Sequence, residues 1–436
     1  MILKSRLKWS SEGTSRTIPV DKTLTKISKL VDKIGVTRLA DITYMDRLFI
    51  PNYSSVLPGT DDYIWVYSGK GATKKHAKAS ALMESIERYS SLPNFYLGDF
   101  IQGSHKDLSS KYKILHPYQV VEPLNFDYND EMIMDYLLGY DIQNKDEILV
   151  PAALALFRYH PNSPAINPFA VHHTNGLASG NVLEEAVCHS LCEVIERDAI
   201  SLAQLRASAI PYHFLVHISE NLAINGYSIN GNSIKDSFFD DNAIFPDIDL
   251  DSIDFLPANK LIDKFQTENI SLFIKDITSD IGIPTFIATS VEWISHDYGY
   301  LAEGHGTHPD KRIALLRSIT EVSQTRAANI QGARDDLRKI RYSDGNNEDK
   351  RSWQFTPSTK IINFSDIPSY YQVDILDDIN LILQNLKRSG LNQVIVVNLT
   401  NPNLDIPVVR TIVPGLETFK FLKSVIGPRA KAYFKK

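Results

Sequence analysis

Three glycine-bearing turns along the chain each come directly before a long helical run. These turns lie within 68–71, 173–181 and 304–306, and the helices are expected over Thr73–Ser91, from Leu183 and from about Pro309. Apolar residues that recur every three or four positions identify the helical runs. A segment rich in β-branched and aromatic residues precedes the first turn. This recurrence of glycine turn and helix, with strand-like segments between, predicts a mixed α/β (α+β) fold with long helices.

The same patterns predict the remaining elements and the domain organisation. One helix is expected at 21–34, paired strands within 271–293, and buried strands at 393–399 and 406–413. Polar segments at 225–257 and 341–352 predict surface loops. The 436 residues are expected to form a single domain with three approximate lobes, 1–150, 151–335 and 336–436.

Composition excludes several classes of protein. The chain has 46 Lys plus Arg against 52 Asp plus Glu, a net charge of −6, which argues against a nucleic-acid binder that neutralises phosphates. No apolar run approaches the roughly 20 residues that span a bilayer, and no signal peptide is evident. Cys188 and Cys192 are the only cysteines, so neither a disulfide framework nor a Cys-rich zinc site is expected. We therefore expect a soluble, cytoplasmic protein.

Two of the expected helices carry carboxylates on one face. The shared feature is a spacing of three or four residues, found in Glu84 and Glu87 and again in Glu185, His189, Glu193 and Glu196. Like charges at this spacing repel, so an enclosed face of this kind requires a compensating cation. Oxygen ligands favour Mg²⁺, which commonly bridges carboxylates to substrate phosphates. The alternative is two solvated helix faces laced with Glu-Arg pairs.

The third helix adds Glu321, Gln324 and Arg326, which are suited to phosphate oxygens or to orienting carboxylates. The two cysteines lie among apolar residues, and we expect them to be buried packing residues without a redox role. The Gly-Lys-Gly turn lacks the spacing of a Walker A loop, and no third glycine completes a Rossmann fingerprint.

An acidic run at Asp247, Asp249 and Asp251 has the alternation of a calcium loop. An EF-hand requires a glycine at its sixth position and a glutamate at its twelfth, where this chain has Ser252 and Ala258. We therefore do not expect calcium there.

The ordered set of motifs resembles the YcaO family across most of the chain. The motifs are Ser68-Gly-Lys-Gly, Ser80-x-x-x-Glu84-x-x-Glu87-Arg88, Asn175-Gly…Gly180-Asn181, Glu185-(x)₇-Glu193-x-x-Glu196-Arg197 and Gln324-x-Arg326. The resemblance implies a YcaO-type fold around a central ATP–Mg²⁺ site. It implies magnesium ligands at Glu84, Glu87, Glu193 and Glu196. It implies nucleotide contacts at Arg16, Thr23, Ser80, Asn181, Glu185, Arg197, Gln324 and Arg326.

The family's chemistry implies ATP- and Mg²⁺-dependent activation of a peptide-backbone amide. A nucleophile adds to the amide carbonyl, the oxygen is phosphorylated, and loss of phosphate completes the exchange. The nucleophile decides the product: external sulfide gives a thioamide, a Cys, Ser or Thr side chain gives an azoline (a cyclodehydratase), and an N-terminal amine gives an amidine (a macrocyclase).

The C-terminal segment favours the first product. Azoline-forming relatives typically end in Pro-x-Pro-x-Pro, whereas 407–417 and 427–430 here resemble members that act beside a TfuA partner in thioamide formation. We expect thioamidation of a ribosomally made peptide or protein, a TfuA-like or other partner for peptide recognition and sulfur delivery, and a homodimer. A non-catalytic nucleotide- or peptide-binding scaffold is the alternative of a different class.

Overall fold

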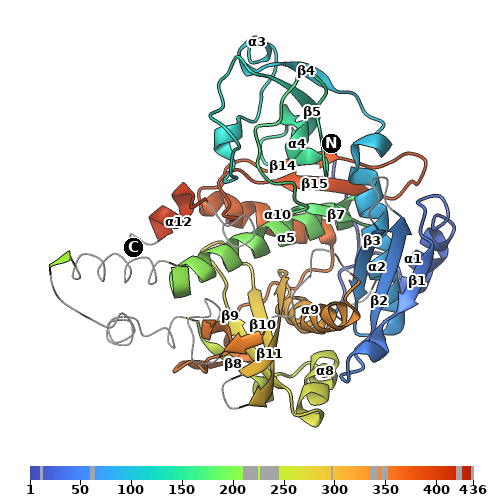
Figure 1. The fold of residues 1–436 in the computed structure, drawn as a ribbon, viewed down its shortest axis with the longest axis vertical. Helices are drawn as coiled ribbons and strands as arrows, with labels where there is room; N and C mark the ends of the chain where they lie inside the picture. The colour runs from blue at the N-terminus through green and yellow to red at the C-terminus, as the bar shows by residue number, and fades with distance from the viewer. Residues whose placement is uncertain are drawn as a thin grey trace.

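Three β-sheets and a set of long helices packed between them make up the structure, which is a computed structural model (Figure 1). It describes residues 1–9, 13–58, 64–209, 224–225, 245–295, 298–333, 342–344, 352–418 and 425–433. The predicted mixed α/β fold is confirmed. Most of both expected surface loops lies outside the described residues.

The strands fall into three sheets. The first has the order β1-β2-β3, with β1 (Arg38–Asp41), β2 (Asn52–Pro58) and β3 (Ile64–Lys70). The second has the order β12-β11-β10-β9-β8-β13, with β8 (Asp247–Asp249), β9 (Ser271–Asp276), β10 (Thr285–Ser295), β11 (Tyr298–Thr307), β12 (Tyr342–Asp344) and β13 (Ile361–Asn363). The third has the order β4-β5-β14-β15-β7, with β6 paired to β5; its strands are β4 (Ile101–Ser104), β5 (Ile133–Asp141), β6 (Asp146–Pro151), β7 (Leu177–Ser179), β14 (Ile395–Asn398) and β15 (Val408–Ile412).

Within the described ranges, five longer helices and several short ones accompany the sheets. The longer ones are α2 (Lys74–Ser91), α5 (Leu183–Gln204), α8 (Leu256–Thr267), α9 (Lys311–Gln331) and α10 (Ile375–Arg388). The shorter ones are α1 (Val20–Ser28), α3 (His105–Leu108), α4 (Ala152–Ala155) and α12 (Pro428–Tyr433). Three-residue helical turns include η1 (Thr43–Met45) and η7 (Ser352–Gln354).

Three strand–helix units account for the recurring glycines. The helices α2, α5 and α9 each pack back on the strand that precedes them, β3, β7 and β11. A Cβ at Gly69 would lie 2.1 Å from the Ala81 nitrogen of α2, and one at Gly306 would lie 1.9 Å from the Ala314 oxygen of α9. Glycine therefore allows backbone to approach backbone. The three expected turns are in part strand: Gly69 lies in β3, Leu177–Ser179 form β7, and Gly304 and Gly306 lie inside β11.

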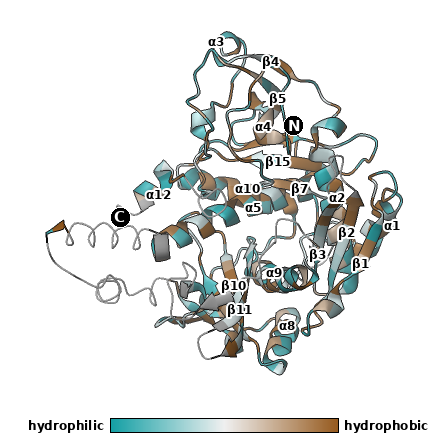
Figure 2. Cartoon of the chain, in the orientation of Figure 1, coloured by the Kyte–Doolittle hydropathy of each residue, from teal (hydrophilic) through white to brown (hydrophobic). Residues whose placement is uncertain are grey.

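Apolar residues of the sheets and helices form several buried clusters. Hydrophobic colour follows the central strands in Figure 2, and hydrophilic colour the outer helix faces. The first helix is shorter than expected: it ends at Ser28, and turns follow to Gly35, whose φ is 78°. Cys188 and Cys192 are buried in an apolar cluster, as expected.

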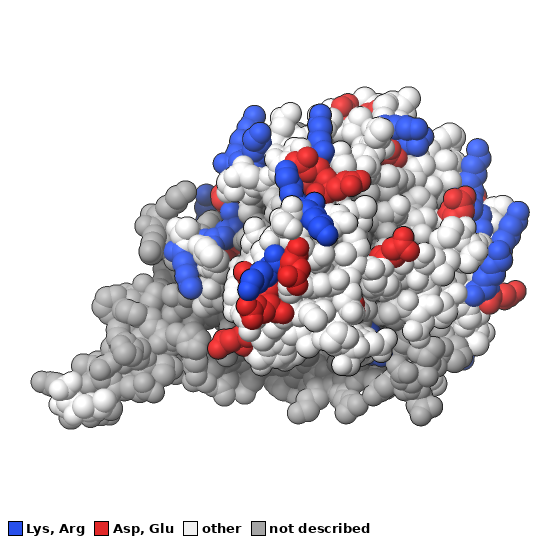
Figure 3. Space-filling view, turned by 90° about the horizontal axis from the view of Figure 1, so that it is seen from above, with Lys and Arg blue, Asp and Glu red and all other residues white. Residues whose placement is uncertain are grey.

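Surface properties agree with the composition. On the face seen in Figure 3, basic and acidic side chains of the described residues lie interspersed over the molecule. Among the helices of the described residues, none has the length and apolarity to cross a membrane.

Candidate functional site

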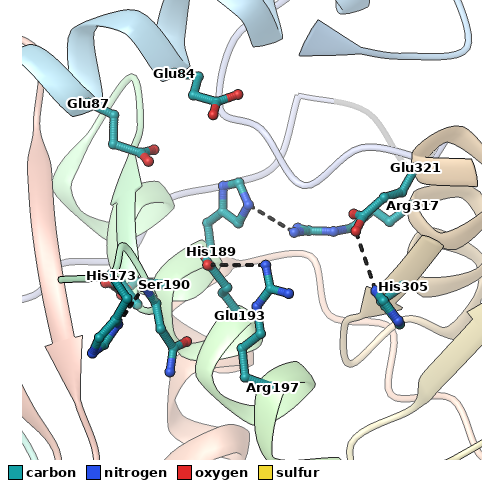
Figure 4. A network of polar contacts seen from close by, with 12 residues as sticks. Glu84, Glu87, His173, His189, Ser190, Glu193, Arg197, His305, Arg317 and Glu321 are labelled. Atoms are coloured by element: carbon teal, nitrogen blue, oxygen red, sulfur yellow. Dashed lines mark hydrogen bonds and ion pairs between the residues drawn. The ribbon is translucent and has the colours of Figure 1, made fainter. Parts of the chain in front are cut away.

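Two helices place four acidic side chains around one interior space. Glu84 and Glu87 lie one turn apart on α2, and Glu193 and Glu196 have the same spacing on α5. Figure 4 shows both carboxylates of α2 facing the region of Glu193. The Ser179 hydroxyl of β7 donates to the backbone of α2 at 3.2 Å and lies 3.5 Å from Glu87 Oε2. Since β7 leads into α5, this contact ties the two carboxylate helices together.

Glu87 has a strongly raised pKa. Its burial raises the pKa to about 8, Arg88 opposes the rise, and the charges of Glu84 and Glu193 add to it. Arg88 donates to Glu87 at 3.0 Å and to Glu84 at 3.2 Å. One guanidinium is thus shared between two carboxylates, and the raised pKa of Glu87 shows that its charge is undercompensated.

The α5 carboxylates show the same deficit of positive charge. Burial raises the pKa of Glu193; Arg197 and Arg88 oppose this, while Glu196 adds to it. Arg197 Nη2 lies 3.8 Å from Glu193 Oε1. Glu196 is buried and its Oε2 atom has no hydrogen-bond partner. An excess of buried carboxylate oxygen, one atom of it unpaired, fits a divalent cation that prefers oxygen ligands, such as Mg²⁺.

Four of the residues expected to contact nucleotide gather at the start of α5. Glu185 accepts hydrogen bonds from the Thr17 nitrogen and hydroxyl, both at 2.7 Å, and from Arg16 Nη1 at 3.3 Å. It also accepts from the backbone and side-chain nitrogens of Asn181, both at 2.9 Å. The Thr23 hydroxyl donates to Asn181 Oδ1 at 2.9 Å. These hydrogen bonds hold residues 16–23 of the N-terminal segment against the start of α5, the helix that also carries Glu193.

Helix α9 supplies a wall on the other side of the space (Figure 4). Burial lowers the pKa of His189 well below its usual value, and the charge of Arg317 lowers it further. The neutral imidazole therefore accepts a hydrogen bond from Arg317 Nη2, with His189 Nε2 at 2.9 Å. This contact links α9 to the carboxylate stripe of α5.

A second contact on α9 centres on Glu321. Lys70 at the end of β3 forms an ion pair with it, and His305 Nδ1 of β11 lies 3.4 Å from Glu321 Oε1. Burial alone would raise the pKa of Glu321, but Lys70, His305 and Arg197 outweigh it and the net pKa is lowered. This wall therefore combines a charged carboxylate with several cationic groups, which suit phosphate oxygens.

Arg326, one of the residues expected to contact nucleotide, is paired with two carboxylates in the fold. Its guanidinium is fully buried, donating to Asp46 at 2.8 and 2.9 Å and to Glu292 at 2.7 Å. With two carboxylates already paired to it, Arg326 fixes the segment after η1 and strand β10 against α9. The arginine of α9 that faces the site is Arg317 (Figure 4).

The other expected residues are placed as follows. Gln324 donates to the Ser68 carbonyl of β3, so it joins α9 to the first sheet. Ser80 is half-buried, one turn before Glu84 on α2. The sequence-based prediction does not include Arg317, and it quotes Lys70 only within the Ser68-Gly-Lys-Gly motif, without a role in the site. The four-residue spacing of Arg317 and Glu321 on one helix was the signal that could have identified the first of them.

A separate buried group lies between α5 and α10. Ligand-type atoms of Cys188, His308 and Asp378 lie within 4.8 Å of one another. Lys8 Nζ is 2.6 Å from Asp378 Oδ2, with both side chains at most 2% exposed, so the carboxylate already has a cation. His308 Nδ1 accepts from the Asp310 nitrogen at 2.9 Å, which leaves the proton of the neutral ring on Nε2. We interpret this group as a buried ion pair that anchors the N-terminal segment.

The sequence matches a known protein family and relatives of similar length. The family model described as YcaO cyclodehydratase, ATP- and Mg²⁺-binding, matches residues 68–224 and 239–417. An uncharacterised protein of Methanothermobacter thermautotrophicus is 30% identical over 419 residues, covering 94% of this chain and 97% of the relative. An uncharacterised protein from the tfuA 3′ region of Rhizobium leguminosarum bv. trifolii is 28% identical over 433 residues, covering 95% of this chain and 92% of that protein.

Solved structures share the fold. YcaO from Methanopyrus kandleri bound with AMPPCP and Mg²⁺ superposes with a TM-score of 0.66 at 21% identity, covering 96% of this chain and 97% of that one. A heterocyclase in complex with substrate and cofactor gives a TM-score of 0.71 at 22% identity, and 54% of its length is covered. The predicted cofactors, ATP and Mg²⁺, are confirmed by the family match. The chain belongs to the YcaO family, as an ATP- and Mg²⁺-dependent peptide-modifying enzyme that activates backbone amides.

Proposed function

We propose that this enzyme installs a thioamide in the backbone of a ribosomally made peptide or protein, with sulfide as the nucleophile and a TfuA-like protein as partner. The observation that carries the proposal is the match over 95% of the chain to a relative encoded in a tfuA 3′ region. A genetic neighbour of this kind supports a shared pathway, and the match extends across the whole catalytic region.

The site residues have complementary roles in this proposal. Glu84, Glu87, Glu193 and Glu196 would hold Mg²⁺, which supplies neutralisation of phosphate charge when bound. Cationic and polar side chains would orient the nucleotide: Arg16, Thr23, Ser80, Asn181, Arg197, Arg317 and Gln324. Glu185 would act indirectly, by holding Arg16 and Asn181 in position, because five hydrogen bonds already engage its carboxylate.

The reaction needs no nucleophile from this chain. A hydrosulfide ion adds to the amide carbon, and the carbonyl oxygen takes the γ-phosphoryl group. The carbon–oxygen bond then breaks, phosphate leaves with the former S–H proton, and C=S forms. Positive charge beside the transferring group lowers the barrier, as in other phosphoryl transfers.

The decisive experiment combines the enzyme, its partner and a verified peptide with ATP, Mg²⁺ and sulfide. Mass spectrometry should show an oxygen-to-sulfur exchange at one residue. Loss of water instead would identify an azoline or an amidine. An unchanged mass would refute all three products, thioamide, azoline and amidine, for that peptide.

A binding measurement separates an enzyme from a scaffold. Calorimetry of ATP with Mg²⁺ should show binding to the wild type and to Glu131→Ala, an exposed control, and a loss of at least about tenfold in affinity for Glu193→Ala. Unchanged affinity in Glu193→Ala would contradict the proposed metal site.

A further inference from the structure

One face of strand β3 lies against α2, and Tyr67 is on that face. Gly69 identifies the face, because a Cβ there would lie 2.1 Å from the Ala81 nitrogen of α2. Side chains alternate along a strand, so Tyr67 points to the same side as Gly69 would. Its cross-strand partner on β2 is Ser55, whose hydroxyl accepts a hydrogen bond from Ser85 of α2 at 2.8 Å. Tyr67 therefore lies level with Ser85 on the carboxylate helix.

Charged residues of the proposed metal site surround the Tyr67 hydroxyl. Glu84 immediately precedes the residue of α2 that is level with Tyr67, and Arg88 follows one turn later. Burial raises the pKa of the Tyr67 hydroxyl; the charge of Arg88 opposes this rise and that of Glu84 adds to it. Arg158 and Glu87 have the same two opposing effects. The phenol is therefore protonated at neutral pH and lies close enough to the carboxylate cluster to interact with it electrostatically.

The fold makes no use of the Tyr67 hydroxyl. In the described part of the chain no residue donates to it or accepts from it, although the side chain is half-buried. The hydroxyl is also open to solvent, so a ligand can reach it. By contrast, the Tyr53 hydroxyl of β2 donates to Asp41 at 3.1 Å. A phenol beside a charged site with an unpaired and accessible O–H group is available as a donor to a ligand.

The position of Tyr67 along α2 separates it from the residues expected to contact nucleotide. The charge of Arg16 acts on His76 in the first turn of α2, and Lys75 in the same turn lies 2.8 Å from Asp21. The part of α2 that is level with Tyr67 lies about ten residues further on, roughly 15 Å along the helix axis. The nucleotide is therefore expected near the start of α2, which leaves the other end for the peptide substrate.

A stacked cation extends this surface beyond Tyr67. Trp65 lies two residues earlier on the same face of β3, with its ring 6.5 Å from the ring of Tyr67. The Arg158 guanidinium carbon lies 5.6 Å from the centre of the Trp65 ring. Arg158 has a φ of 54°, a left-handed conformation that is strained for a residue with a Cβ atom. The Phe157 nitrogen donates to the Ser91 carbonyl at 2.9 Å, so this strained residue is held at the C-terminal end of α2.

We propose that Tyr67 is a catalytic residue whose hydroxyl donates a hydrogen bond to the carbonyl oxygen of the amide being activated, while the peptide lies over Trp65 and Arg158. An electron pair of the nucleophile forms the new bond to the amide carbon, and the π pair of the carbonyl moves to its oxygen. That oxygen bonds to the γ-phosphorus as the bond to ADP breaks. Tyr67 keeps its proton throughout and stabilises the negative charge that develops on the oxygen.

Kinetics of Tyr67→Phe test the role in turnover. The substitution keeps the ring and removes the hydroxyl, so kcat should fall at least about tenfold while the KM for ATP is unchanged. The hydroxyl bonds to nothing in the described fold, so the urea concentration at half-unfolding should not change. Tyr89→Phe is the matched control: this half-buried tyrosine of α2 stacks on Phe95 at 3.9 Å, and the variant should keep the wild-type kcat. A wild-type kcat in Tyr67→Phe would overturn the proposal.

A labelled substrate tests the contact without turnover. A verified peptide with carbon-13 at the reacting carbonyl is bound together with Mg²⁺ and AMPPCP, and its NMR signal is compared with that of the free peptide. A hydrogen bond polarises the carbonyl and moves this signal downfield. We expect a larger downfield shift with the wild type than with Tyr67→Phe, and equal shifts would contradict the assignment.

Calorimetry distinguishes the peptide from the nucleotide as the partner of the hydroxyl. Tyr67→Phe should bind ATP with Mg²⁺ as tightly as the wild type does; a tenfold loss of affinity would place the hydroxyl on the nucleotide and overturn the proposal. Arg158→Asn removes the cation and keeps a residue that tolerates a positive φ, so the KM for the peptide should rise several-fold. An unchanged KM would overturn the assignment of this surface to the peptide.

This proposal and the proposed thioamide function fail separately. The hydrogen bond from Tyr67 serves the phosphorylation of the amide oxygen, which is common to all three nucleophiles. A wild type that makes an azoline or an amidine would refute the thioamide function and leave the role of Tyr67 intact. A wild type that makes a thioamide, with Tyr67→Phe equally active, would leave the function intact and refute the role of Tyr67.

Discussion

Replacing Glu87 by glutamine should stabilise the metal-free protein, and more at high pH than at low pH. In the unfolded chain this carboxyl titrates near 4.5, whereas burial and the neighbouring carboxylates raise its pKa to about 8 in the fold. The stability associated with the neutral form is therefore fully present below about pH 4.5 and is lost as the pH rises through about 8. Glutamine stays neutral throughout.

The pKa difference sets the size of the effect. Compared with a side chain that stays neutral, the Glu87 carboxyl lowers the free energy of unfolding by about 1.5 kcal/mol at about pH 5.5 and by about 4.5 kcal/mol at about pH 8.5. Glu87→Gln should therefore raise the free energy of unfolding by roughly 3 kcal/mol more at the higher pH. Arg88 keeps Glu84 as a partner at 3.2 Å, so the substitution does not leave it unpaired.

Urea unfolding with a chelator present, at both pH values, measures this difference. Glu131→Gln, at an exposed position, is the control and should change the free energy of unfolding by less than about 0.5 kcal/mol at either pH. In the presence of ATP and Mg²⁺ the order should reverse, since the wild type gains binding energy that the variant lacks. If Glu87→Gln changed the free energy of unfolding equally at the two pH values, the negative charge of the carboxylate cluster would not need a bound cation to neutralise it, and the reasoning would be refuted.

Two further predictions separate structural from functional charges. Arg326→Met leaves Asp46 buried and unpaired, so it should cost about 3–5 kcal/mol in urea unfolding, whereas Arg317→Met should cost under about 1 kcal/mol and raise the KM for ATP about tenfold. The opposite pattern would favour Arg326 over Arg317 as the nucleotide contact. Lys8→Met removes the cation beside Asp378, whose pKa burial raises to about 6 against the opposing charge of Lys8. The pKa should rise further, so the variant's loss of stability should be larger at about pH 8 than at about pH 5; equal losses would contradict a buried ion pair.

Local patterns were enough to predict much of the protein. Helical periodicity located α2, α5 and α9, because the position of a side chain on a helix face depends only on residues within a few turns. The same argument placed Glu84 with Glu87 and Glu193 with Glu196, and the oxygen-rich set indicated magnesium. The order of these motifs along the chain was sufficient to indicate the family.

Contacts between distant segments were decided only by the tertiary structure. Arg16 meets Glu185 across 169 positions, and Arg326 meets Asp46 across 280, separations at which periodicity carries no information. Arg317 and Arg326 look alike in the sequence, yet the packing of α9 turns one toward the site and encloses the other between carboxylates. The sequence by itself determined which groups each helix carries; which of them share one interior space, and which donors remain unpaired there, followed from how the three sheets bring those helices together.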